Sequence, residues 1–192
     1  MVRLDGAVYL RGRFEAPWGF VTPPAPELAD ALYPGARQIV IFHAIIEGTC
    51  EVLLDTGESV HLEAGDIAII PFGDKHALIS PGSPLRCAVS ELLPPPPWAN
   101  LDISQSGESF GPPTRMLCSY LVCNDLLFNP LLQALPPLFK ISPAPGPGAD
   151  WLRASLAYAA ELTPQAIARD ALGSRLPELL LVETLRQYWS SR

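Results

Sequence analysis

The segment GDIAIIPFGDKH, residues 65–76, decides the predicted fold. Its first two residues are a turn signal, and the apolar run IAII that follows is typical of a strand buried on both faces. Pro71 lacks the N–H group that a sheet requires, so it ends this strand. Gly73 belongs to a second turn, and His76 follows where the next strand begins. The spacing therefore predicts a strand, a turn and a second strand that opens with a histidine.

A longer strand is predicted upstream, between Gln38 and Cys50. Successive side chains of a strand point to opposite faces, and here both faces are apolar. One face carries Ile39, Ile41, His43 and Ile45, and the other carries Val40, Phe42, Ala44 and Ile46. We therefore expect a strand that is buried on both sides, with His43 as its one ionisable group between residues 39 and 46.

Further short strands flank these two, with turns about every eight to twelve residues, which is the pattern of a sandwich or a barrel. The expected strands are Ala7–Phe14, Trp18–Val21, Cys50–Asp55, Ser59–Leu62, Ala77–Ser80, Leu85–Leu92 and Arg115–Cys123. The four prolines at Pro94–Pro97 predict a stiff polyproline II spacer. The polar segment 100–113 predicts a loop.

The chain changes character after Asn124, where helical patterns replace strand patterns. Asp150 and Thr163 are suitable N-caps, and Gly173 is a suitable helix end. Helices are expected at Pro130–Leu135, 151–162, 163–173 and Pro177–Trp189, with one brief strand at Leu138–Ile141. The sequence thus predicts a mainly β chain, with a β-barrel over residues 1–123 and a tail of about three longer helices over residues 124–192.

Composition narrows the function and the compartment. The net charge is −7, the pI is near 4.9, and the 13 basic residues are scattered. A protein that binds nucleic acid needs a basic face, so we expect no nucleic-acid contact through this chain. The start of the chain has no signal-peptide pattern, no apolar run is long enough to span a membrane, and the four cysteines form no CxxC pair. These features predict a cytoplasmic protein without a membrane partner.

Three residues are predicted to bind a ligand inside the barrel. His43 and His76 are expected to point into it, and Trp18 is expected to close one end or to face the cavity. The alternative for Trp18 is an ordinary place in the core.

A metal ion is a second possibility for the two histidines. Zinc or another divalent metal would need a third ligand, for which Cys118 is the best candidate and Glu51 and Asp66 are weaker ones. The alternative is that both histidines are hydrogen-bonded groups of the cavity and that Cys118 is a small buried apolar side chain. His61 lies on a hairpin and is expected to be exposed and inert. The sequence contains no phosphate-binding glycine loop or HExxH motif.

The spacing of Gly65, Pro71, Gly73 and His76 resembles the second motif of the cupin superfamily, whose members are jelly-roll-like β-barrels. The Asn that usually closes this motif is Ser80 here. The first cupin motif usually supplies two histidines and a glutamate to a metal. Here the corresponding segment FHAIIEG contains His43 alone, so the four-ligand cupin site does not carry over.

The chain also resembles the N-terminal cupin sensor domain of AraC-type transcription regulators. The resemblance rests on the order of PWGF, FHAIIEG, GDIAIIPFGDKH, LCSYLVC, NPLLQALPPLF and ELLLVETLRQYW, which together run from about Trp18 to Trp189. It implies a barrel that binds a small effector, and a helical tail that mediates dimerisation and leads to a helix-turn-helix DNA-binding domain. No such domain occurs in these 192 residues. A sensor cut from a longer regulator and a free-standing relative are both open.

The sequence leaves two questions open. The apolar stripe of the last helix, which includes Leu179, Val182, Leu185 and Trp189, fits either a second copy in a homodimer or the outer face of the barrel. The resemblance also leaves an alternative function, a metal-dependent cupin enzyme such as a dioxygenase or isomerase. The missing histidine and glutamate favour a non-catalytic domain.

Overall fold

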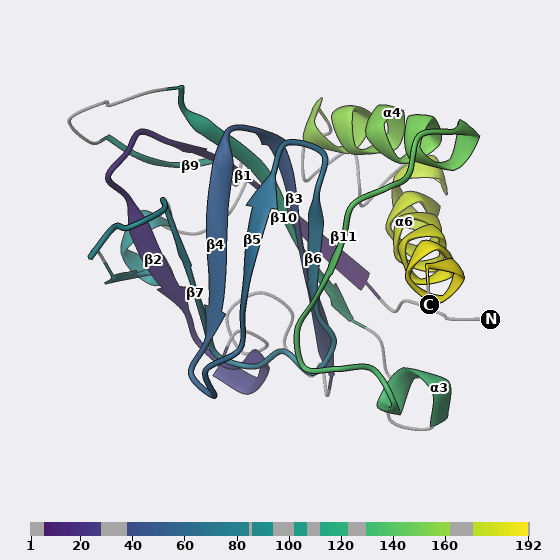
Figure 1. The fold of residues 1–192 in the computed structure, drawn as a ribbon, viewed down its shortest axis with the longest axis horizontal. Coiled ribbons are helices and arrows are strands. Elements are labelled where there is room, and N and C mark those ends of the chain that lie inside the picture. Colours follow the sequence, from purple (N-terminus) through teal and green to yellow (C-terminus); the bar gives the residue numbers. More distant parts are fainter. Residues whose placement is uncertain are drawn as a thin grey trace.

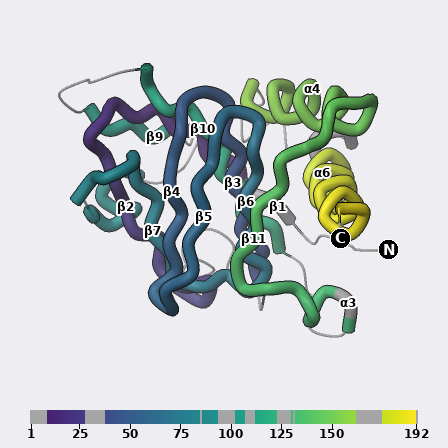
Figure 2. Tube along the Cα trace, viewed as in Figure 1, coloured from purple at the N-terminus to yellow at the C-terminus, as the bar shows by residue number. Residues whose placement is uncertain are grey.

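Two β-sheets face each other, and helices cover the outer side of one of them (Figure 1). The computed structural model describes residues 6–27, 38–84, 86–93, 102–106, 112–122, 130–161 and 171–191. Helices α4 (Pro147–Glu161) and α6 (Ala171–Ser190) form the covering layer, and Figure 2 traces the same arrangement along the backbone. No described helix has both the length and the apolar character that are needed to cross a membrane.

The larger sheet has six strands in the order β11-β6-β3-β10-β1-β9. Their bounds are β1 Gly6–Phe14, β3 Ile39–Glu47, β6 Ile67–Ile70, β9 Asp102–Gln105, β10 Thr114–Val122 and β11 Phe139–Ile141. The smaller sheet has the order β5-β4-β7-β2-β8. Its strands are β2 Gly19–Thr22, β4 Thr49–Leu54, β5 Ser59–Glu63, β7 His76–Ile79 and β8 Cys87–Ala88. Two short helices, α2 (Val89–Leu92) and α3 (Pro130–Gln133), complete the described elements.

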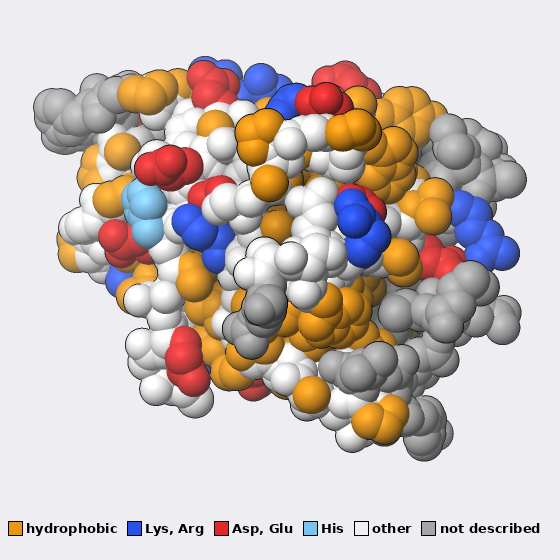
Figure 3. Space-filling model, turned by 45° about the vertical axis from the view of Figure 1, so that its right-hand side comes forward, with side chains coloured by type: hydrophobic (Ala, Val, Ile, Leu, Met, Phe, Trp, Pro, Cys, Tyr) orange, Lys and Arg blue, Asp and Glu red, His pale blue; other side chains and the backbone are white. Residues whose placement is uncertain are grey.

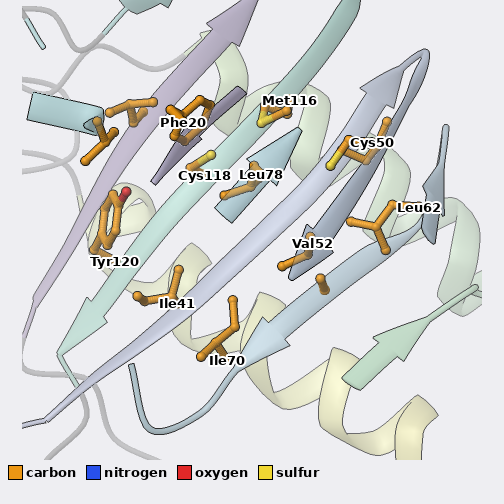
Figure 4. Close-up of a cluster of buried hydrophobic side chains, with 14 of the residues drawn as sticks. Phe20, Ile41, Cys50, Val52, Leu62, Ile70, Leu78, Met116, Cys118 and Tyr120 are labelled. Carbon is orange, nitrogen blue, oxygen red and sulfur yellow. The ribbon is translucent and has the colours of Figure 1, made fainter. Parts of the chain in front are cut away.

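The six-stranded sheet carries a hydrophobic core on each of its faces. One core lies between the sheets, where Ile41 and Ile70 meet Val52 and Leu78 of the other sheet (Figure 4). The other core lies under the helices and includes Phe42 on its sheet side. Strand β3 therefore contributes alternate side chains to the two cores, as the apolar pattern on both of its faces predicts.

The predicted cupin-like fold is confirmed, with one difference in its closure. The described strands form two separate hydrogen-bonded sheets, so the expected barrel is a sandwich. The expected brief strand in the tail is also confirmed, because β11 pairs with β6. The tail therefore supplies a strand to the larger sheet, and the domain boundary between residues 123 and 124 stays a prediction.

Two predictions between the motif and β10 are wrong. The expected strand Leu85–Leu92 is a two-residue strand followed by helix α2, because the Glu91 carboxylate accepts the Ala88 N–H at 3.0 Å and starts a helical turn. The expected loop 100–113 contains strand β9, which pairs with β1 in parallel. An ion pair links Arg11 and Asp102, which are register partners in this pairing, although β9 itself has little apolar character.

The helical tail also begins and ends differently from the prediction. Helix α4 begins at Pro147, so Asp150 is in its first turn and is not its N-cap. Gly173 and Pro177 both lie inside α6, which the buried leucines on its sheet-facing side stabilise. A proline inside a helix removes one backbone hydrogen bond, so this packing has to offset its cost. The segment 163–170 of the second predicted helix and the Pro94–Pro97 spacer lie outside the described residues.

Gly73 shows why the motif requires a glycine at this place. Its φ is +66°, and its carbonyl accepts the N–H of Ala25 at 2.8 Å. A Cβ atom at this position would collide with Ala25 and would lie 2.9 Å from the carbonyl oxygen of Ile39. The turn therefore packs directly on two other segments of the chain.

We predict that Gly73→Ala lowers the free energy of unfolding by about 2–4 kcal/mol, since it combines left-handed strain with overpacking. Gly82 is a matched control, because its φ is +74° and a Cβ there would meet nothing within 4 Å. Gly82→Ala should cost about 1–2 kcal/mol, from backbone strain alone. Urea denaturation of both variants measures the difference, and equal losses would contradict the packing argument.

Candidate functional site

His43 and His76 meet between the two sheets. Their Nε2 atoms lie 2.9 Å apart, and both side chains have an exposed fraction of 0%. His43 comes from β3 of the larger sheet and His76 opens β7 of the smaller sheet. The contact therefore joins the sheets across their shared interior, as the sequence predicts for two histidines that point into it.

The hydrogen bonds define which nitrogens carry hydrogen. The Nδ1 of His76 lies 2.8 Å from the backbone carbonyl of Asp74, which can only accept, so this nitrogen is the donor. The Nε2 of a neutral His76 is then an acceptor, and the Nε2 of His43 donates to it. The Nδ1 of His43 is left as a buried acceptor, and it has no hydrogen-bond partner among the described residues.

Burial keeps both imidazoles neutral. Loss of solvation lowers the pKa of His43 well below its usual range, and charge on His76 would lower it further. Burial likewise lowers the pKa of His76 to about 4, against the opposing effect of its hydrogen bond to Asp74. At neutral pH the pair is therefore an uncharged hydrogen bond in an apolar interior.

Other polar side chains surround the histidine pair. Cys118 is the cross-strand partner of His43 on β10, and Thr22 is the cross-strand partner of His76 on β2. Cys118 and Tyr120 both belong to the core between the sheets, and burial strongly raises the pKa of each. The Cys118 thiol is therefore protonated at neutral pH.

Trp18 lies at one side of the same interior. Its indole stacks on Phe14 with a centroid distance of 4.7 Å, and Phe20 completes the aromatic cluster. The Ser80 hydroxyl accepts the backbone N–H of Trp18 at 3.0 Å and donates to its carbonyl. Ser80, which stands where the cupin motif usually has Asn, therefore holds the backbone of Trp18 in place. The indole Nε1 is buried without a hydrogen-bond partner in the described part of the chain.

The predicted metal ligands come together only in part. The structure joins His43 to His76 and places Cys118 on the adjacent strand, but the described residues contain no group of three His, Cys, Asp or Glu side chains arranged to hold a metal. The three-ligand site therefore does not fit the described geometry, and a bound metal stays a prediction.

The weaker candidates and His61 lie elsewhere. Asp66 is bound to Lys140 at 3.1 Å, and Glu51 is the cross-strand partner of the exposed His61 on the hairpin of β4 and β5.

The polar surroundings of the histidines were not predicted from the sequence. A usable signal exists, because Thr22 is four residues after Trp18 and Tyr120 is two residues after Cys118. Even spacing along a strand places side chains on one face, so each of these residues shares the face of a predicted site residue.

Comparisons with known proteins agree with this architecture. The sequence model of the family described as Cupin matches residues 1–190. The chain belongs to the cupin family. A search among curated proteins gave no match.

Among solved structures, this cupin chain is similar to YhaK from Escherichia coli, with a TM-score of 0.40 and 16% identity over 74% of this chain and 46% of YhaK. ToxT from Vibrio cholerae gives a TM-score of 0.41 and 10% identity over 81% of this chain and 46% of ToxT. A cupin protein from Bacteroides fragilis gives 0.36 and 20% identity over 69% of this chain and 80% of that protein. The chain thus spans about half the length of YhaK and ToxT.

Acid should destabilise the domain through the histidine pair. Each imidazole has a lower pKa when folded than when unfolded, so below about pH 6.5 the unfolded chain binds protons that the folded chain does not. Stability should therefore fall by up to about 1.4 kcal/mol per pH unit for each histidine as pH drops from about 6.5 toward 4.

Urea denaturation between pH 7.5 and 4.5 tests this expectation. His76→Phe should flatten the slope by about one proton per molecule, since it removes one of the two buried imidazoles. An identical pH dependence in the wild type and in His76→Phe would contradict the assignment.

Proposed function

We propose that this cupin domain is a non-catalytic sensor of an AraC-type transcription regulator, which acts in the cytoplasm and binds a small effector between its two sheets. The observation that carries the proposal is the buried His43–His76 contact with its unused acceptor, the Nδ1 of His43. The sequence resemblance from about Trp18 to Trp189 supplies the class of regulator.

The chemistry of the interior suggests what the effector presents. The Nδ1 of His43 calls for a hydrogen-bond donor, and the indole N–H of Trp18 calls for an acceptor. A buried polar atom without a partner costs free energy, so a ligand that supplies one stabilises the folded state. A small molecule with a hydroxyl or amide group on an apolar body fits both needs.

The surroundings support binding more than catalysis. His43 and His76 are neutral, and burial keeps the Cys118 thiol protonated, so the described residues offer no charged acid–base pair near the histidines. A metal-dependent cupin enzyme is the competing function. Stoichiometric iron or manganese in the purified protein, together with turnover of a substrate, would favour that function over ours.

The helical layer supports a role in dimerisation. Leucines and Tyr188 on one side of α6 pack on the larger sheet, while other apolar side chains of α4 and α6 remain exposed. The exposed set is Trp151, Tyr158, Leu179, Val182 and Trp189. Figure 3 turns this side of the molecule forward and shows hydrophobic side chains gathered on it. We propose that a second copy covers this surface.

An effector should raise the melting temperature in a thermal-shift screen of small metabolites. At a hundredfold excess over Kd, we expect a shift of about 5–10 °C for a domain of this size. His76→Ala should abolish the shift while the domain still folds, and His61→Ala should keep it. Complete unfolding of His76→Ala would contradict the proposed site, because the residue would then be structural.

The second copy is tested by analytical ultracentrifugation. Leu179 has an exposed fraction of 50% in the single chain, so Leu179→Glu should leave the fold intact and weaken a dimer at least about tenfold. Ser59→Glu, on the exposed edge of β5, is the matched control and should have no effect. A wild-type chain that stays monomeric at high concentration would contradict the dimer.

A further inference from the structure

A cavity lies outside the interior, between the larger sheet and helix α4. Its volume is about 360 Å³, near the lower end of the ~300–1,000 Å³ that small-molecule sites occupy. The end of β3, the turn before β6, the segment after β11 and one side of α4 form its walls. Four distant parts of the chain thus converge on one hollow.

The floor of this junction cavity is apolar and firmly held. Ile45, Ile67, Leu152 and Leu156 all line it, and each of them is buried. Two backbone hydrogen bonds fix the adjoining turn to β3, from Gly65 N–H to Ile45 at 2.8 Å and from Ile45 N–H to Asp66 at 3.0 Å. The cavity is therefore a preformed apolar surface of suitable size for a small molecule.

The polar groups of the cavity differ in what they can still bind. The Asp66 carboxylate accepts from the Glu63 N–H at 2.9 Å, from Lys140 at 3.1 Å and from Ser142. These three donors include the ammonium group of Lys140, which compensates the charge of the carboxylate. Its oxygens therefore have little capacity left to accept further hydrogen bonds.

Arg153 is the group with donors to spare. It has one ion pair, with Asp150 on the same helix at 2.9 Å, and both side chains of that pair are more than 70% exposed. Such exposed pairs are weak and are easily exchanged for another anion. A guanidinium group has five N–H donors and suits a carboxylate, which it can bind through two parallel hydrogen bonds.

From this combination we propose that the junction cavity binds a small amphipathic carboxylate, with its apolar part on the floor and its carboxylate on Arg153. This site is separate from the interior and does not depend on the histidine pair. Helix α4 also carries Trp151 and Tyr158 on its exposed side. A molecule in the cavity would therefore contact the same helix that contributes to the surface proposed for a second copy.

Isothermal titration calorimetry with octanoate tests the site, and octan-1-ol serves as the uncharged probe. We expect saturable binding of octanoate and at least fivefold weaker binding of octan-1-ol. Arg153→Gln should weaken octanoate about five- to tenfold, since it removes a charge-assisted hydrogen bond. Ala157 lines the cavity, so Ala157→Phe should fill it and abolish binding.

Two controls separate this proposal from the proposed function. Ala154 is exposed on another side of α4, so Ala154→Phe should leave octanoate binding unchanged. His76→Ala changes the interior only and should also leave it unchanged. Loss of binding in His76→Ala alone would overturn the junction site while it left the interior site standing.

Two other results would overturn the junction site as well. One is the absence of saturable binding to the wild type, and the other is equal affinity in the wild type and Ala157→Phe. Circular dichroism checks that Ala157→Phe folds. If it does not, Arg153→Gln decides alone, and unchanged affinity in that variant overturns the proposal.

Discussion

The structure depends on burying two imidazoles between two sheets. A polar group in an apolar interior is costly unless it is hydrogen-bonded, and the His43–His76 contact satisfies three of the four ring nitrogens. The contact exists only in one register, because a slip of one residue in β3 or β7 would turn its histidine out of the interior. The hydrogen bond that links the two sheets therefore leaves one ring nitrogen, the Nδ1 of His43, without a partner among the described residues.

Strand β3 connects this interior to the helical layer. Its alternate side chains fill the core between the sheets and the core under the helices, so both sides of the strand are constrained by packing. On the far side of the second core, α6 has buried leucines toward the sheet and exposed apolar residues away from it. Of the predicted apolar stripe on the last helix, Leu185 packs on the sheet while Leu179 and Trp189 face outward, and a contact with a second copy stays a prediction.

Much of this could be predicted from the sequence, because the decisive signals are local. The glycines and proline of residues 65–76 define a strand and two turns, and the alternation in β3 places His43 on the inner face. Other features depend on contacts between distant segments and have no local signal. Strand β9 exists because of its pairing with β1, and α6 continues through Gly173 and Pro177 because its leucines pack on the sheet. A third metal ligand likewise has no local signal in the sequence. Strand pairing places Cys118 beside His43, but the described residues do not complete a ligand group.

The most direct test of the account is a pH titration of the histidine ring nitrogens by long-range ¹H–¹⁵N NMR. The account predicts that the rings of His43 and His76 stay neutral from pH 7.5 down to about pH 5, with hydrogen on the Nε2 of His43 and on the Nδ1 of His76. Titration of the rings of His43 and His76 near pH 6.5 would show that the imidazoles are not buried against each other, and would contradict the account.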